Sequence, residues 1–270
     1  MQKSVSRILF LLLFLLGVGS NIWAQEVGTH ILQRVFLIKY GKECGASFTI
    51  DVQGRQYLIT ARHLVEGIKE GDSIDLFHEN QWKSLKAKPL YLEPAEVEIV
   101  VLALPIQISP SYPLELGAGG LCISQNTYFL GFPYGQAVDA RTLNNGFPLP
   151  FVKQGICSAV YFSPKKYAVL FLDGMNNPGF SGGPIVFFDR DSRKLTVAGV
   201  VAGYRNQKDK VLKPSMEKYN KANSSAEALD EEYVETDMIV RSNAGIVVGY
   251  SINTALEAIA KNPIGAVIVK

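Results

Sequence analysis

The chain of 270 residues has few of the side chains that hold metal ions or build disulfide frameworks. It contains three cysteines and three histidines. Cys44, Cys122 and Cys157 match no zinc-ligand spacing, so we expect no metal and no cofactor. An odd number of cysteines leaves at least one thiol unpaired. A disulfide between Cys122 and Cys157 is an alternative that the sequence does not decide, because it does not give the distance between them. We otherwise expect the cysteines to be buried and inert.

The chain also lacks a large excess of positive or negative charge. Lysine and arginine together number 27, aspartate and glutamate 25, and the formal net charge is +2. No basic stripe indicates a nucleic-acid partner, and no acidic tail indicates a scaffold. Hydrophobic residues make up 47% of the chain, which suits one domain with a large core or two tightly packed halves.

Long hydrophobic runs are limited to one, at residues 8–18. Lys3 and Arg7 precede it, and Ala24 follows it. The run is shorter than the roughly 20 residues that cross a bilayer as a helix. The order of positive, apolar and small residues is typical of a secretory signal. We predict a signal peptide over residues 1–24 and an exported, periplasmic or secreted chain without a stable membrane anchor, a retained anchor being the alternative.

The rest of the chain consists of short apolar runs that alternate with turn residues. Its 24 glycines and 13 prolines separate these runs, a spacing typical of an all-β sandwich or barrel. Residues 45–60 are predicted to form a β-hairpin, and residues 245–252 a last strand. A terminal helix is expected at 254–260, with Asn253 as its N-cap.

The segment of residues 176–184, with the sequence NNPGFSGGP, carries one serine among three glycines. Glycine frees the backbone where a side chain would clash, and proline presets φ at a turn. Ser181 can therefore present its hydroxyl, and the N–H groups of Gly179 and Ser181 can turn towards one point. These are the nucleophile and the oxyanion donors of an acyl-transfer site. A glycine-rich turn between two strands is the alternative reading.

A histidine and a carboxylate precede this serine in the chain. An apolar strand runs into His63, and Glu98 stands at the head of the apolar run 97–102. A histidine that takes the serine proton and a carboxylate that orients the histidine complete such a site. His30 and His78 have no comparable chemical context.

The G-x-S-G-G-P pattern at Ser181, the T-A-R-H block ending at His63 and the E-I-V-V-L block starting at Glu98 together resemble the chymotrypsin-like serine endopeptidases. The Asn-Pro-Gly before the serine resembles their exported bacterial Deg-type branch. The resemblance covers about residues 35–252. It implies an all-β chain of two antiparallel six-stranded β-barrels with a short C-terminal helix. It also implies a catalytic His63, Glu98 and Ser181, with the N–H groups of Gly179 and Ser181 as the oxyanion hole.

The same resemblance divides the mature chain, residues 25–270, into a first barrel at about 30–108 and a second at 109–270. Residues 205–241 break the pattern because they are rich in charged and small polar side chains. We expect a surface insertion there, partly disordered or with a short helix at 225–233, and a flap over the pocket is the functional alternative. The chain ends soon after the last strand, so no peptide-binding PDZ domain is expected.

Two residues depart from the family pattern. Glu98 stands where the family has aspartate, and its extra methylene requires another rotamer or a shifted backbone to reach His63. Glu96 is the alternative partner. Arg62 stands where a small residue is common, and a cation beside a general base lowers the pKa of that base if the two side chains approach.

The resemblance also places the substrate. Met175 falls at the floor of the specificity pocket, and because it is not acidic we expect a medium apolar P1 side chain rather than lysine or arginine. Ala202, Gly203 and Tyr204 would bind the substrate backbone by strand addition. A core strand without substrate contacts is the alternative for this segment.

The predicted function is hydrolysis of peptide bonds in peptide or protein substrates. The main rival is a catalytically impaired homologue that binds extended peptides. Arg62 and the glutamate at position 98 favour this rival, and the intact serine loop argues against it. An esterase with the same triad is a third reading.

Overall fold

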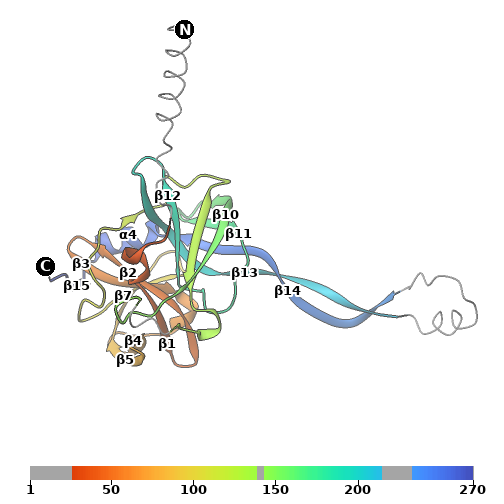
Figure 1. Cartoon of the computed structure of the whole chain (residues 1–270), viewed down its shortest axis with the longest axis horizontal. Helices are drawn as coiled ribbons and strands as arrows, with labels where there is room; N and C mark the ends of the chain where they lie inside the picture. Colours follow the sequence, from red (N-terminus) through yellow and green to blue (C-terminus); the bar gives the residue numbers. More distant parts are fainter. Residues whose placement is uncertain (1–25, 139–142, 215–232, 270) are drawn as a thin grey trace, which may run out of the picture.

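The computed structural model describes residues 26–138, 143–214 and 233–269. The predicted signal peptide lies outside these ranges, as does the predicted helix at 225–233 except for Tyr233. Strands dominate the described chain and curl into two sheets (Figure 1), which confirms the all-β class. No helix in the described ranges is long and apolar enough to cross a bilayer.

The first sheet forms a barrel with the strand order β5-β4-β1-β2-β3-β7-β6. Its strands are β1 (Val35–Tyr40), β2 (Glu43–Val52), β3 (Arg55–Ala61), β4 (Ser73–His78), β5 (Gln81–Lys86), β6 (Lys88–Tyr91) and β7 (Ile99–Ala103). Ala87 alone separates β5 from β6. Its N–H donates to Asp72 O (2.8 Å), and its carbonyl accepts from Gly71 N (3.0 Å). β5 and β6 therefore act as one bent strand that closes a six-stranded ring.

The predicted hairpin is β2 and β3, and its turn explains the local sequence. Gln53 and Gly54 both have positive φ, 52° and 73°. Two consecutive residues with positive φ give a hairpin turn whose twist matches that of the flanking strands. The hairpin delivers the chain to a single 3-10 turn, η1 (Arg62–Val65), at the end of the barrel.

The second sheet closes into a ring of six strands. Its strands are β9 (Asn126–Gly131), β10 (Phe151–Phe162), β11 (Ala168–Asp173), β12 (Pro184–Asp189), β13 (Lys194–Pro214) and β14 (Tyr233–Ser251), with the short β8 (Glu115–Leu116) at the edge. The order is β12-β9-β10-β11-β14-β13, and β13 pairs with β12 again. The expected pair of antiparallel six-stranded barrels is thus confirmed.

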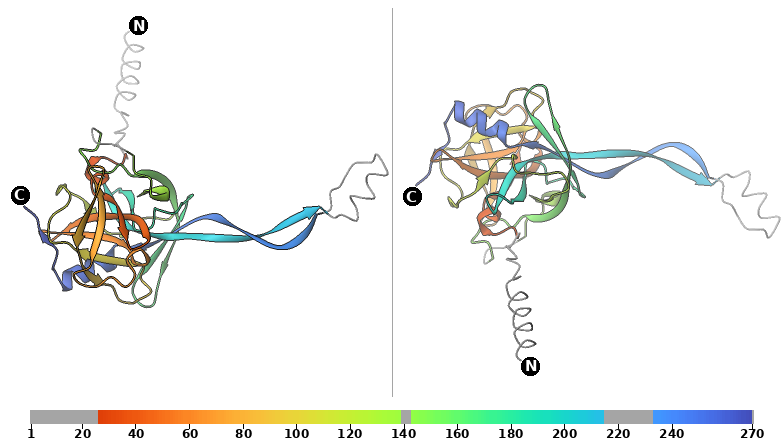
Figure 2. Two further views of the ribbon diagram at one scale, coloured as in Figure 1. Left: turned by 90° about the horizontal axis from the view of Figure 1, so that it is seen from below. Right: turned by 90° about the horizontal axis from the view of Figure 1, so that it is seen from above.

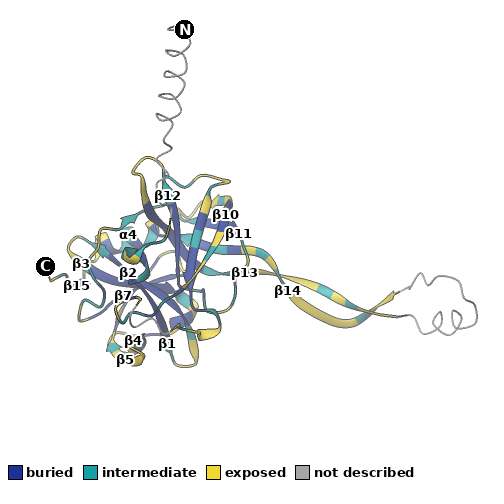
Figure 3. Cartoon of the chain, in the orientation of Figure 1, coloured by how far each residue is buried: buried dark blue, intermediate teal, exposed yellow. Residues whose placement is uncertain are grey.

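Strand β1 shows how the two barrels are held together. Phe36 and Ile38 belong to the core inside the first barrel. Val35 and Leu37, on the other face, belong to a cluster that also contains residues of the second barrel such as Val186. Because side chains alternate along a strand, both faces of β1 are buried. Figure 3 colours buried residues dark blue, and they occur throughout both barrels. The segment before β1 contributes the short helix α2 (Thr29–Leu32) with a buried Ile31.

The C-terminal segment returns to the first barrel, although the expected division assigned it to the second. Helix α4 (Asn253–Lys261) packs beside β6, and β15 (Ala266–Val267) pairs with β3. The N-cap of α4 is Ile252 and makes no side-chain cap hydrogen bond. Asn253 is therefore not the cap as expected. Its Oδ1 accepts instead from Ala118 N (3.3 Å). This hydrogen bond connects the helix to the segment that links the two barrels.

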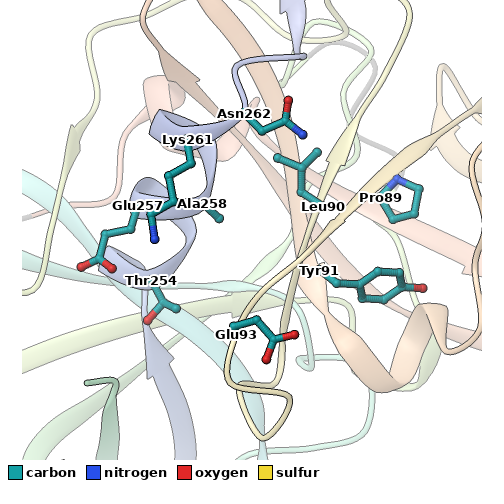
Figure 4. A pocket seen from close by; sticks show the side chains of 9 residues that line it. All are labelled: Pro89, Leu90, Tyr91, Glu93, Thr254, Glu257, Ala258, Lys261 and Asn262. Atoms are coloured by element: carbon teal, nitrogen blue, oxygen red, sulfur yellow. The ribbon is translucent and has the colours of Figure 1, made fainter. Parts of the chain in front are cut away.

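A cavity of about 400 Å³ lies between α4 and β6 (Figure 4). Glu257 and Lys261 line it from the helix, and Leu90 and Glu93 line it from the first barrel. None of the site residues predicted from the sequence is among the residues that line it. The cavity is therefore separate from the candidate active site.

Strands β13 and β14 continue beyond the second barrel as a two-stranded arm. Their pairing runs on from Asn206↔Asn243 to Pro214↔Tyr233, and Figures 1 and 2 show the arm projecting from the barrels. The described residues of the expected surface insertion at 205–241 are largely exposed, but they form paired strands and not the solvated loop that we expected. Polar composition suggested a loop, but a ribbon with both faces in solvent is also polar, so composition says little about backbone pairing.

Candidate active site

The serine segment connects β11 to β12, and its glycines are required by close contacts. Gly179 has φ +100°, and a Cβ on it would lie 2.0 Å from Phe132 O. Gly182 has φ +85°, and a Cβ on it would lie 2.0 Å from Ala46 O in the first barrel. Any side chain at these positions would push the serine loop away from its neighbours. The local sequence thus allows Ser181 to sit where the two barrels meet.

Two backbone donors of this loop are free. Among the hydrogen bonds of the described chain, none has Gly179 N or Ser181 N as donor. The N–H groups on either side behave differently: Phe180 N donates to Asn177 O (3.3 Å) and Gly182 N to Val201 O (2.7 Å). The two unengaged N–H groups are available to an oxygen that gains negative charge.

His63 lies in η1 at the end of β3, and Glu98 lies directly before β7. The Oε2 atom of Glu98 is 3.1 Å from Nδ1 of His63 and accepts from His63 N at 3.3 Å. The longer side chain of glutamate therefore does reach the histidine. When Nδ1 carries the proton that Glu98 accepts, Nε2 is left as the free base of the ring.

The environment of Glu98 favours its ionised form. The hydrogen bond from His63 holds the pKa of the Glu98 carboxyl below its usual value, while partial burial acts in the opposite direction. Glu96, the alternative partner, makes an ion pair with Lys165 instead. Glu98 is thus the carboxylate that the structure brings to His63.

The hydroxyl of Ser181 does not meet the histidine in this structure. Its Oγ donates to Ala202 O at 3.3 Å, and no hydrogen bond among the described residues joins it to His63. Hydrogen bonds of a catalytic serine are often poorly aligned without substrate and tighten in the complex.

Arg62 is turned away from the site. Its Nη2 donates to Leu92 O (2.8 Å), and its guanidinium lies 5.5 Å from the centroid of the Tyr91 ring. These contacts hold the cation on the β6 side of the barrel, against the connection to β7. The premise that Arg62 approaches the base His63 is therefore not met.

The predicted substrate residues lie along β13 and at the start of the serine loop. The pairing of β13 with β14 shifts register between Val201 and Gly203, so Ala202 is the extra residue of a bulge. Its carbonyl is the one that accepts from Ser181. Tyr204 pairs with Val247 in the ladder. Met175 is 56% exposed, so its side chain does not form a closed pocket floor in this structure.

Three residues that tie the serine loop in place were not found from the sequence. Asn176 is 1% exposed, and its Nδ2 donates to Gly203 O at 3.2 Å. Asn243, at the base of the arm, donates to Asn176 O at 2.5 Å. Lys153 on β10 donates to Met175 O at 2.7 Å. No local pattern marks these side chains, because their partners lie 22 to 67 residues away.

No group of three or more histidine, cysteine or acidic side chains suited to a metal occurs in the part of the chain that is described. All three cysteines are free. Cys157 is buried and Cys44 half-buried, as expected of inert thiols, but Cys122 is exposed. The expectation of burial is wrong for Cys122, because it lies in a surface turn before β9.

Comparison with known proteins identifies the family of the chain. Residues 45–200 match the family described as the trypsin-like peptidase domain, which is more than half of the chain. The chain therefore belongs to the trypsin-like peptidase family, and it is a hydrolase of the serine endopeptidase class. No curated protein matches the chain.

Solved structures share the fold. The inactive form of a serine-to-alanine mutant of Rv3671c from M. tuberculosis H37Rv is 16% identical with a TM-score of 0.52, over 90% of this chain and 92% of that one. The HtrA-type protease AlgW with a tripeptide is 18% identical with a TM-score of 0.52, over 87% of this chain and 62% of that one. At such low identity the likeness concerns the fold.

Proposed function

We propose that this serine endopeptidase cleaves peptide bonds with Ser181 as nucleophile, His63 as base and Glu98 as the acid that orients the base. The observation that carries the assignment is the double hydrogen bond to one oxygen of Glu98, from the backbone and the ring of His63. It fixes the ring orientation and leaves Nε2 free. In the triad template the buried acid plays this same part.

The proposed reaction uses these groups in turn. Ser181 Oγ attacks the scissile carbonyl and passes its proton to Nε2 of His63, and Glu98 stabilises the imidazolium. The carbonyl oxygen becomes an oxyanion that accepts from Gly179 N and Ser181 N. As the C–N bond breaks, His63 returns the proton to the leaving amine, and water later releases the acyl group by the same route.

The substrate is a peptide or protein segment in extended form. Its backbone would add to β13 at Ala202, Gly203 and Tyr204, where the bulge turns a carbonyl towards the nucleophile. A medium apolar P1 side chain beside Met175 remains our proposal for specificity. Assays with peptides that differ only at P1 test it, and faster cleavage after lysine or glutamate than after leucine or valine contradicts it.

We also propose that the chain is exported and acts in the periplasm or outside the cell. The support is the order of charges, apolar run and small residue over residues 1–24. Expression of the full chain in a secreting bacterium, followed by N-terminal sequencing of the exported product, tests this. A product that begins at Gln25 supports export, and an uncleaved chain in the cytoplasm refutes it.

A catalytically impaired peptide-binding homologue is the second candidate. One observation favours it: the Ser181 hydroxyl bonds to Ala202 O rather than to His63. Labelling of the purified chain with a fluorophosphonate probe separates the two candidates, because the probe reacts only with an activated serine. We expect labelling that Ser181→Ala and His63→Ala abolish. Ser192→Ala, in an exposed turn, is the matched control and should label like the wild type.

A further inference from the structure

Lys153 occupies an unusual position for a lysine. It lies on β10 directly opposite Phe129, so both side chains stand on the same face of the sheet, and Phe129 is fully buried in the second barrel. Phe129 packs edge-on against Phe180 (ring centroids 5.4 Å apart), the residue next to Ser181. The ammonium of Lys153 lies 5.2 Å from the centroid of the Phe180 ring. The lysine therefore sits beneath the serine loop.

The ammonium of Lys153 also makes two hydrogen bonds to this loop. Nζ donates to Met175 O at 2.7 Å and also to Oδ1 of Asn177. These acceptors lie six and four residues before Ser181. Within the described chain, Lys153 is the one charged side chain that is hydrogen-bonded to residues 174–183. All other bonds of this loop come from neutral groups, such as Asn243.

The charge of Lys153 has no acidic counterpart. No ion pair among the described residues includes it. Burial of the ammonium lowers the pKa of Lys153, and no carboxylate offsets this effect. A partly desolvated cation must have its donors satisfied, and here the loop oxygens supply the acceptors. The loop conformation and the charged lysine thus depend on each other.

The backbone of the serine loop can rotate easily at Gly179, so contacts that restrain it matter. Gly179 adopts φ +100°, a region that glycine enters and leaves without steric cost. A rotation of the peptide before Gly179 would turn one of the two free N–H groups away from the nucleophile. Hydrogen bonds from a charged donor are about twice as strong as neutral ones, so they restrain the loop more than its amide contacts do.

We propose that Lys153 is a positioning residue for catalysis: its ammonium holds residues 175–180 in the conformation that keeps Gly179 N and Ser181 N free for the oxyanion. This role rests on the proposed function of Ser181. Lys153 does not touch the reacting atoms and acts through Met175, Asn177 and the Phe180 ring. Removal of its charge should therefore lower the rate of the chemical step and leave substrate binding nearly unchanged.

The test compares three variants of the full chain. Lys153→Met keeps the apolar stem and removes the donors, Lys153→Arg restores charged donors, and Lys194→Met removes a solvent-exposed lysine that pairs with Glu115. We expect Lys153→Met to lower kcat and the rate of fluorophosphonate labelling by about tenfold to a hundredfold, the cost of a misplaced catalytic group. KM should change by less than about twofold, and Lys153→Arg should recover most of kcat.

Hydrogen exchange supplies a readout that does not depend on activity. In Lys153→Met, amides of residues 174–183 should exchange about tenfold faster, while those of the first barrel keep the wild-type rate. Unchanged exchange in this loop, or a wild-type kcat, overturns the proposal. An effect on KM alone, or a loss confined to substrates with an acidic P1 side chain, also overturns it, because Lys153 would then bind substrate. If the wild type and Lys194→Met both fail to label, the proposed function fails instead.

Discussion

Strands β13 and β14 show the same pairing in two different settings. In the barrel, β13 pairs with β12 on one side and β14 on the other, and Val200 is completely buried. In the arm, each strand has only the other as partner, and Ile239 and Val240 are 59% and 52% exposed. The colours in Figure 3 change along the two strands, from dark blue for buried residues in the barrel to yellow and teal for exposed and intermediate residues in the arm. The backbone ladder thus continues where the hydrophobic core has ended.

This difference separates two sources of stability. Burying a valine side chain contributes about 1.5–3 kcal/mol, and an isolated two-stranded ribbon is at best marginal in water. The barrel therefore determines the stability of the chain, and the arm adds little to it. At the base of the arm the two regions meet, because Asn243 and Gly245 bond to Asn176 and Gly174 of the serine loop.

The largest expected loss of unfolding free energy is for a substitution in the barrels. Gly182→Ala places a Cβ 2.0 Å from Ala46 O at a residue with φ +85°. We expect it to cost more than about 3 kcal/mol of unfolding free energy, because both strain and overlap act at the contact between the barrels. Urea unfolding measures this. Gly203→Ala, with no atom within 4 Å of the added Cβ, is the control and should stay within about 0.5 kcal/mol of wild type.

A smaller effect is expected for valines at the two ends of the same ladder. Val200→Ala should reduce the unfolding free energy by about 2 kcal/mol, through two lost methyl groups and the cavity they leave. Val240→Ala, on the arm, should change it by less than about 0.5 kcal/mol. Both values come from urea midpoints with unchanged m-values. Equal losses at the two sites would mean that the arm is buried against a partner in solution.

The contact between the arm and the serine loop should depend on the side chain of Asn243. Asn243→Ala removes the hydrogen bond to Asn176 O, and we expect a loss of about 1 kcal/mol in stability and slower fluorophosphonate labelling. Asn206→Ala changes the residue directly opposite in the ladder, which makes no side-chain bond to the loop. If Asn206→Ala slows labelling as much as Asn243→Ala, the effect belongs to the arm as a whole and not to the junction.

The smallest expected effect is the pH dependence of stability that Glu98 causes. Its lowered pKa means that the folded protein favours the ionised form more than the unfolded chain does, so its contribution is present above the unfolded value of about 4.3. The contribution is lost as the pH falls through the lowered pKa of the folded state. Glu98→Gln should therefore be less stable than wild type at pH 7, and the gap should shrink near pH 3.

A glutamate in the arm provides the control for Glu98→Gln. Glu235→Gln breaks a solvent-exposed pair with Lys210, and exposed pairs contribute about 0–1 kcal/mol. Urea unfolding at both pH values should show little difference from wild type. A gap for Glu98→Gln that does not depend on pH would show that the glutamine disturbs packing instead of removing an ionised partner of His63.

Much of the candidate site could be predicted from local sequence. The glycines around Ser181 indicated a loop with special backbone angles, and the strand leading into His63 placed the histidine at the end of a barrel. The distance from Glu98 to His63 could not be judged in this way. It depends on how the head of β7 lies beside η1, which is set by the pairing of β3 with β7.

The fold was predictable for a similar reason. Short apolar runs between turn residues indicate β-strands, because a strand buries alternate side chains and a turn needs glycine, proline or a small polar residue. The residues of the arm show no regular alternation of apolar and polar side chains, because neither face of the ribbon packs on a core, so their pairing could not be recognised from hydrophobicity. Polar composition suggested a loop where β13 and β14 run on together.

The sequence by itself determined where strands and tight turns form and which segment presents a nucleophilic serine, because these depend on residues close together along the chain. Only the tertiary structure decided which carboxylate reaches His63, that Lys153 lies beneath the serine loop and that β15 returns to β3. Each of these contacts joins segments that are 22 or more residues apart. Such contacts depend on how distant segments pack against one another, and that is a property of the whole folded chain.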